Sequence, residues 1–170
     1  MSKRRQVRER VLQGLYAQEV SGDDAEFVLD NIVRTPFGDD AAAARFAEKL
    51  FLRGLDVREE ADALLAVHVR NWEIKRLALT DRLVVRLAVA EFLHFPDIPP
   101  KVTINEALEL AKAFSTEKSG GFVNGVLDAI LGDLRDSGRL KKAGRGLVEM
   151  TPNGGRRKRS SAGGESPASD

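Results

Sequence analysis

Apolar residues recur at every third or fourth position along most of the chain, the spacing that places them on one face of an α-helix. This pattern predicts a helix over Lys3–Glu19 and a shorter one over Ala25–Val33. A near-heptad stripe predicts a third, long helix over Ala41–Val67. No segment alternates apolar and polar residues with the period of two that a half-buried strand requires, so we expect no strands.

The second half of the chain repeats the helical pattern. A junction that contains Trp72 and Ile74, both expected to be buried, leads to a helix over residues 80–95, which Pro96 ends. Residues 101–134 then hold two amphipathic helices joined by a polar segment. We therefore predict an all-α fold over residues 1–138, built from two packed subdomains of three to four helices, about 1–68 and 69–138.

Side chains that can cap a helix N-terminus precede the later helices: Asp39 or Asp40, Thr80 or Asp81, Thr103 with Glu106, and Ser119. Thr103 and Glu106 have the spacing of a capping box, in which each side chain accepts a hydrogen bond from the other residue's backbone N–H. Gly54 lies inside a predicted helix, where glycine costs about 1 kcal/mol against alanine, and so predicts the close approach of a neighbouring helix. Gly120–Gly121 is expected to be a flexible hinge.

The last 32 residues, 139–170, differ from the rest in composition. They are rich in glycine, serine, proline, lysine and arginine, and apolar residues are scarce. Such a segment cannot bury enough apolar surface to offset the entropy of ordering it. We therefore predict a disordered basic tail. Its cluster Arg156, Arg157, Lys158 and Arg159 could bind RNA weakly and without specificity, or the tail could serve only solubility.

Composition argues against several kinds of chemistry. The chain has no cysteine, so it has neither a disulfide framework nor a thiolate zinc site, and His68 and His94 are too few for a histidine metal cluster. No nucleophile and base stand in a recognisable arrangement, and no phosphate-binding loop follows a strand. No apolar run reaches the ~20 residues of a membrane span, and no signal peptide is readable. We expect a cytoplasmic protein without catalytic activity, metal or cofactor.

Charge is distributed unevenly along the chain. The first ten residues carry five basic and one acidic side chain, and residues 139–170 carry eight basic and three acidic ones. Because the whole chain has a net charge of +1, residues 11–138 carry −8. Basic ends favour phosphate groups, and the acidic middle suits a basic protein partner.

The arginines at the start of the first helix are candidate RNA ligands. Arg4, Arg5 and Arg8 are three or four positions apart, so a helix brings them to one face. Each guanidinium offers a planar fork of donors that suits phosphate oxygens. A solvated charged face without a partner is the alternative interpretation.

A second set of candidates lies near the starts of the last two helices. Lys101 adds a positive charge, Phe122 could stack on an unpaired base, and Asn105 or Asn124 could read a base edge. We expect these side chains to cluster. Phe122 could equally belong to the core, and Asn105 could serve only the first helical turn.

Two segments of the chain resemble one known family. INEALELAKAFSTEKSGGFVNGVLD, Ile104–Asp128, closely resembles the C-terminal signature of the NusB family of bacterial transcription antitermination factors. RRQVRERVLQGLYAQE, Arg4–Glu19, resembles the arginine-rich first helix of the same family. The resemblance covers roughly residues 3–135 and is specific because the two segments occur together.

The resemblance implies an all-helical protein that binds the boxA element of ribosomal RNA transcripts as single-stranded RNA. It implies that the protein acts together with NusE, a small-subunit ribosomal protein, and through that complex helps the RNA polymerase elongation complex pass terminators. By position, the residues expected near RNA are Arg4, Arg5, Arg8, Lys101, Phe122 and Asn124, and those expected to face NusE are Tyr16 and Asp81.

Two other functions stay open as alternatives. NusB-like domains also precede the catalytic domain of some ribosomal RNA cytosine methyltransferases, but we do not expect that enzyme here, because the chain has no cysteine nucleophile and no catalytic domain follows. A helical adaptor that binds proteins and no RNA is the second alternative. The sequence leaves open whether the protein is a monomer or a homodimer.

Overall fold

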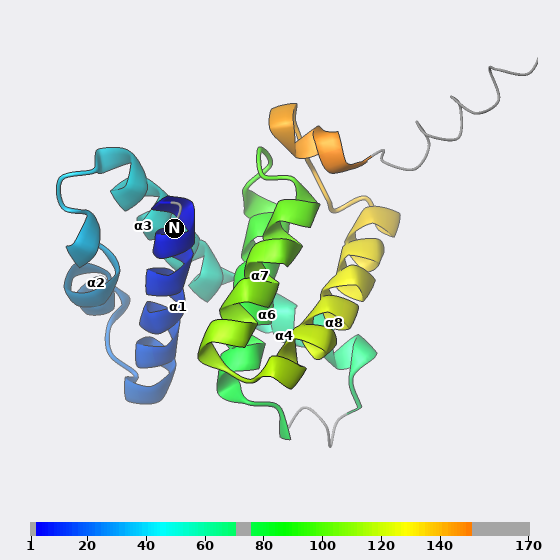
Figure 1. Ribbon diagram of the computed structural model, residues 1–170, viewed down its shortest axis with the longest axis horizontal. Coiled ribbons are helices and arrows are strands. Elements are labelled where there is room, and N and C mark those ends of the chain that lie inside the picture. Colours follow the sequence, from blue (N-terminus) through cyan, green and yellow to red (C-terminus); the bar gives the residue numbers. More distant parts are fainter. Residues whose placement is uncertain (1–2, 71–75, 151–170) are drawn as a thin grey trace, which may run out of the picture.

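The computed structural model describes residues 3–70 and 76–150, and every regular element within them is helical. The helices α1, α2 and α3 stand beside a second group formed by α4, α6, α7 and α8 (Figure 1). No strand occurs in these two ranges, so the all-α prediction is confirmed. Trp72 and Ile74, expected to be buried, lie outside the described residues.

The elements have the following bounds: α1 Lys3–Ser21, α2 Ala25–Val28, a π-helical turn Leu29–Val33, a 3-10 turn Thr35–Phe37, α3 Ala41–Asp56, α4 Arg58–His68, α6 Leu79–His94, α7 Pro100–Phe114, α8 Glu117–Asp136 and a 3-10 helix Gly144–Met150.

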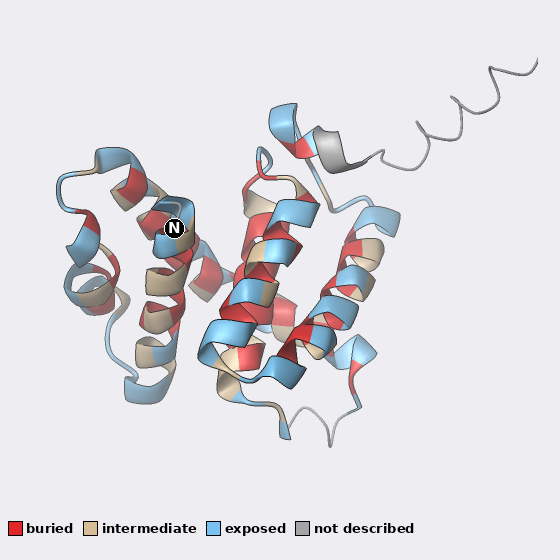
Figure 2. Cartoon of the chain, in the orientation of Figure 1, coloured by how far each residue is buried: buried red, intermediate tan, exposed pale blue. Residues whose placement is uncertain are grey.

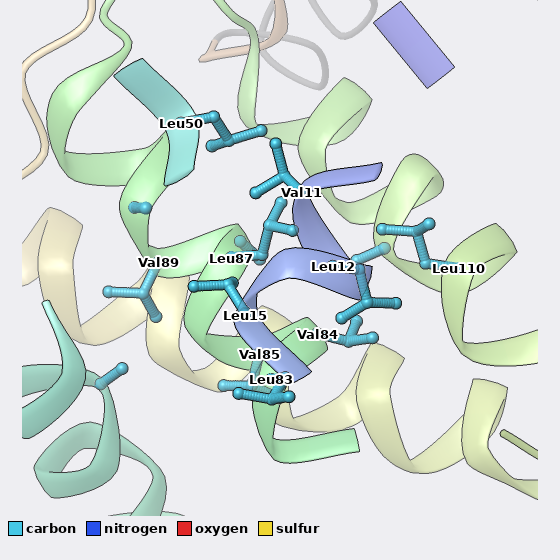
Figure 3. Packing of buried hydrophobic residues seen from close by; sticks show 14 of the residues in the cluster. Val11, Leu12, Leu15, Leu50, Leu83, Val84, Val85, Leu87, Val89 and Leu110 are labelled. Atoms are coloured by element: carbon cyan, nitrogen blue, oxygen red, sulfur yellow. The ribbon is translucent and has the colours of Figure 1, made fainter. Parts of the chain in front are cut away.

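Helix α6 is the centre of the molecule. Every residue from Leu83 to Phe92 is buried, and α1, α3, α4, α7 and α8 all pack against this helix. Figure 3 shows Leu12 and Leu15 of α1 among the α6 side chains, with Leu110 of α7 beside Leu12. Figure 2 shows α7 and α8 with buried residues on their inner sides and exposed residues outside. A helix surrounded in this way must be largely apolar on every side, and between Leu83 and Phe92 only Arg86 and Glu91 are charged.

Two glycines allow α1 and α3 to pack closely. A Cβ at Gly54 of α3 would lie 3.3 Å from two methyl carbons of Leu15, which confirms the close approach predicted for Gly54. A Cβ at Gly14 of α1 would lie 2.5 Å from a methyl carbon of Val33 and 3.3 Å from the ring of Phe51. Because glycine has no side chain, these two positions allow the short distance between α1 and α3.

The prediction of one long helix over Ala41–Val67 is wrong. Helix α3 ends at Asp56, Val57 has φ −89° and ψ 8°, and α4 begins at Arg58. Both helices pack on α6, but α3 also packs on α1 whereas α4 also packs on α8. Val57 is itself buried, so the apolar stripe continues through the break. The break between the two helices therefore leaves no signal in the pattern of apolar residues.

Helix α4 therefore lies with the second group of helices, although its residues fall within the predicted first subdomain. The buried apolar residues of both groups form one continuous cluster. The division of the chain into two subdomains stays a prediction.

Asp40 caps α3 as predicted, because its side chain accepts a hydrogen bond from the backbone N–H of Ala43. The other predicted caps are wrong. Helix α6 starts after Ala78, α7 after Pro99 and α8 after Thr116, whose hydroxyl accepts from the N–H of Ser119. Thr80, Asp81, Thr103, Glu106 and Ser119 all lie inside helices.

Gly120 and Gly121 also lie inside α8, so they are not the hinge that the sequence suggested. The turn between α7 and α8 consists of Ser115 and Thr116.

The chain remains helical or packed beyond the predicted start of the tail at residue 139. The N–H of Ala143 donates to the carbonyl oxygen of Pro96 at 3.0 Å, and a 3-10 helix begins at Gly144. Arg139 forms an ion pair with Glu60 of α4. The described structure thus continues through the 3-10 helix Gly144–Met150, and residues 151–170 of the predicted tail lie outside the described residues.

Gly14→Ala should destabilise the protein by about 1–3 kcal/mol, because the added methyl group overpacks the contact with Val33. Gly132→Ala in α8 is the matched control: nothing lies within 4 Å of its Cβ position, so the helix gains up to about 1 kcal/mol. Urea unfolding of the two variants measures both effects. An unfolding midpoint of Gly14→Ala at or above that of the wild type would contradict the packing described here.

Candidate nucleic-acid interface

The three arginines predicted to form one RNA-binding face have different environments. Arg4 is exposed, and its guanidinium carbon lies 4.5 Å from the centre of the Phe46 ring on α3. Arg5 is half-buried and Arg8 is buried. Only Arg4 and part of Arg5 therefore face solvent.

The Arg8 guanidinium is fully engaged inside the protein. Its Nε and Nη2 donate to the two carboxylate oxygens of Glu91 on α6, at 2.7 and 2.9 Å. The Arg8 side chain is 4% exposed and that of Glu91 1%. Thr103 of α7 donates its hydroxyl to Glu91 at 2.8 Å, which explains why Thr103 does not cap α7. Arg8 thus joins α1 to α6 and α7, and no open face of its guanidinium is left for an RNA phosphate.

Arg5 makes a similar contact nearer the surface. Its Nε and Nη2 donate to the two carboxylate oxygens of Glu106 on α7, at 3.0 and 2.7 Å. These hydrogen bonds hold the pKa of Glu106 below its usual value and raise the pKa of Arg5. Glu106 is committed to α1 and cannot close the predicted capping box.

A groove of about 550 Å³ lies between the start of α1 and the start of α7. Three exposed cations line it, Lys3 and Arg4 at the start of α1 and Arg145 after α8, together with the buried Arg8. Val102 and Pro99 form its α7 side, and Glu106 and Asp97 also line it. Lys101 is exposed in the same first turn of α7 as Val102. The start of α7 therefore adds a fourth exposed cation beside this groove.

Phe122 and Asn124 do not cluster with Lys101 as expected. Helices α7 and α8 run antiparallel, so their starts lie at opposite ends of the pair (Figure 1). With a rise of 1.5 Å per residue, the two ends of α7 are about 20 Å apart. Phe122 and Asn124 lie about 8 and 10 Å back along α8 from the far end, so about 10 Å along the helix axis separates them from Lys101. Phe122 is half-buried and lines a separate hollow, whereas Asn124 is exposed on α8.

The two residues expected to face a protein partner are also separated. Tyr16 is 46% exposed and lines a hollow of about 360 Å³ with Leu12, Gln13, Thr80 and Phe114. Asp81 is buried, and its Oδ2 accepts a hydrogen bond from the Ser119 hydroxyl at 2.9 Å. Its Oδ1 is buried without a hydrogen-bond partner in the described part of the chain. Asp81 lines the hollow of Phe122 rather than that of Tyr16.

Among the described residues, no three or more His, Asp or Glu side chains are placed to hold a metal ion. His68 is hydrogen-bonded to Asp133 of α8 at 2.6 Å, and His94 is the last residue of α6. Burial lowers the pKa of His94. No helix within residues 3–70 and 76–150 is long and apolar enough to cross a membrane.

Sequence reasoning missed Glu91, the residue that fixes Arg8. A signal was present, because Glu91 is an acidic residue inside an otherwise apolar run, and a buried carboxylate needs a charged partner. Its partner is 83 positions away, and spacing within a helix cannot identify so distant a residue. Arg145 was missed because it lies in the segment predicted to be disordered.

Comparison with known proteins gives consistent results. The model of the NusB family matches residues 5–132. A protein named transcription antitermination protein NusB from Salinibacter ruber is 51% identical over 150 residues, which cover 88% of this chain and 94% of that protein. A similarly named protein from Symbiobacterium thermophilum is 35% identical, covering 82% of this chain and 96% of that protein.

Solved structures agree with these sequence relatives. NusB of T. maritima has a TM-score of 0.70 and 35% identity, and the match covers 78% of this chain and 92% of that one. A chain from a crystal structure of the antitermination factors NusB and NusE in complex with double-stranded RNA has a TM-score of 0.69 and 28% identity. It covers 78% of this chain and 98% of that one.

Arg8→Met should destabilise the protein by about 3–5 kcal/mol, because it leaves the Glu91 carboxylate buried without its charged partner. Arg4→Met is the matched control; it removes only an exposed contact with Phe46, worth about 1 kcal/mol or less. Adding Glu91→Leu to Arg8→Met should recover part of the stability. Urea unfolding measures all three, and equal destabilisation in the two single variants would contradict the assigned role of Arg8.

Proposed function

Because the chain belongs to the NusB family, we propose that it is an RNA-binding transcription antitermination factor. In this proposal it binds the boxA element of ribosomal RNA transcripts as single-stranded RNA, together with NusE. The complex then helps RNA polymerase pass terminators, so that the contact with polymerase is indirect. The observation that carries the proposal is the groove between the starts of α1 and α7, which is lined by Lys3, Arg4 and Arg145. The related structure with NusE and double-stranded RNA supports it.

The proposed RNA surface begins at this groove. Arg4 and Lys101 are exposed on neighbouring helices and supply charge for phosphates, and the half-buried Arg5 adds its positive charge nearby while it holds Glu106. Arg8 is a positioning residue in this proposal, since its ion pair with Glu91 sets how α1 lies on α6. Phosphate contacts attract a nucleic acid strand and set its path without reading its sequence.

Phe122 and Asn124 form the second part of the proposed RNA surface. Phe122 offers a half-buried ring beside a hollow, where an unpaired base can stack, and Asn124 offers an exposed amide. Because Lys101 lies on α7 and these two residues lie on α8, a strand that contacts both parts passes from one helix to the other. Reading of base identity is assigned to this second part.

We place the NusE site around Tyr16. Tyr16 and Phe114 are large exposed aromatic residues at one apolar hollow, and aromatic anchors of this kind dominate many protein interfaces. The charge of −8 over residues 11–138 suits a basic ribosomal protein. Asp81 is buried, so we assign it to holding Ser119 of α8 rather than to direct contact.

The proposal gives the protein a binding role in the cytoplasm and no catalytic one. A protein adaptor that binds no RNA would use the Tyr16 hollow alone and leave the cationic groove unused. RNA titration with and without NusE distinguishes this alternative from the proposal.

The double variant Arg4→Ala/Lys101→Ala should weaken binding of a boxA-type single strand and reduce its salt dependence. Removing one phosphate contact lowers the slope of log K against log salt by about 0.7 for single strands, so the expected reduction is about 1.4. Fluorescence anisotropy over a salt series measures this slope. The control is Arg135→Ala, an exposed arginine in the last turn of α8. An unchanged slope in the double variant would remove these residues from the interface.

Tyr16→Ala should weaken binding to NusE by about 2 kcal/mol or more if Tyr16 is the central anchor. Phe27→Ala is the control, since Phe27 is also an exposed aromatic residue but belongs to α2. Calorimetric titration with NusE measures both variants, and RNA binding in the absence of NusE should be the same in both. Comparable affinity for NusE in the two variants would rule out the hollow as its site.

A further inference from the structure

The segment after α8 returns to the body of the protein and packs on the end of α6. The N–H of Ala143 donates to the carbonyl oxygen of Pro96. Gly146 is buried against the same residue, where a Cβ would overlap the Pro96 carbonyl oxygen. The absence of a side chain at Gly146 thus permits this close approach. The family model ends at residue 132, so this packing belongs to a part of the chain beyond it.

Lys142 anchors the segment. Its Nζ donates to the backbone carbonyl oxygens of Glu91 and Phe95, at 3.1 and 2.9 Å. The last carbonyl groups of a helix have no N–H donor within the helix, and the helix dipole favours a cation at this end. Lys142 supplies both a donor and a positive charge there. Burial lowers the pKa of Lys142 to about 8. Its ammonium group points inward and is not part of the outer charged surface.

The anchor places Arg145 in the cationic groove. Arg145 is exposed and lines the groove with Lys3 and Arg4, which come from the other end of the chain. Glu106 in the groove is already engaged by Arg5, and Lys3 forms an ion pair with Asp40 at 3.8 Å. Asp97 is therefore the acidic residue of the groove that is left to offset Arg4 and Arg145. The groove therefore keeps an excess of positive charge.

We propose that Arg145 is a further RNA-binding residue, held beside Arg4 by the Lys142 anchor. The ligand is a phosphate of the RNA backbone, which the guanidinium can bind through two parallel N–H donors. The inference rests on the proposed RNA-binding function and extends its surface with a segment beyond residue 132, where the family model ends. Because the contact is to the backbone, it raises affinity for any sequence and adds no base specificity.

The test compares Arg145→Ala with Lys141→Ala in the full chain. Both variants remove one exposed cation from the same segment, but Lys141 does not line the groove. Anisotropy over a salt series with a boxA-type strand should give a slope about 0.7 smaller for Arg145→Ala and an unchanged slope for Lys141→Ala. Equal slopes in the two variants overturn the inference. They would mean that Arg145 attracts RNA no more specifically than Lys141 does, or that it does not contact RNA.

Lys142→Met tests the anchor. It should reduce RNA affinity as much as Arg145→Ala does, and the double variant should bind no more weakly than either single one, since both act through one contact. Additive effects contradict the anchoring role, and circular dichroism confirms that the helices are intact. If Arg4→Ala/Lys101→Ala reduces affinity and Arg145→Ala does not, this inference alone fails. If the wild type binds no RNA, the proposed function fails with it.

Discussion

The buried ion pair between Arg8 and Glu91 is the interaction on which the arrangement of this protein depends. Two charges withdrawn from water are costly unless each donor and acceptor is matched, and here two hydrogen bonds join the side chains while Thr103 donates a third. At the other end of α1, Glu19 accepts a hydrogen bond from the buried Arg86, also on α6. Helix α1 is thus fixed on α6 near both ends, which leaves little freedom in its rotation or register.

Because the register of α1 is fixed, its arginines have different roles. Arg8 points inward to Glu91, Arg5 bridges to Glu106 on α7, and Arg4 emerges at the surface over Phe46. A cationic groove forms where α1 and α7 begin, since the pairs that hold the helices together also bring these two starts side by side. The geometry of the groove therefore depends on a residue of the core, the buried carboxylate of Glu91.

Sequence periodicity predicted the helices well because each carries an apolar stripe, but it could not predict which polar residues face inward. The break at Val57 was missed because the stripe continues through it. Thr103 and Ser119 were assigned to caps because local spacing allows that role, whereas the fold uses both hydroxyls to satisfy buried carboxylates on α6. Those carboxylates are 12 and 38 positions away in the chain, beyond any local pattern. The residue types alone identified the polar side chains that could be functional. Their hydrogen-bond partners could be identified only from the folded structure.

Cross-linking of a boxA-type RNA to the wild-type protein, followed by mass spectrometry, tests the central claim most directly. The claim is that one RNA surface spans the starts of α1 and α7, held together by the Arg8 ion pair. With photoreactive groups attached to backbone phosphates along the strand, we expect a single RNA to label peptides from both helix starts in the same complex. Labelling of α8 around Phe122 with no label on either start would contradict it.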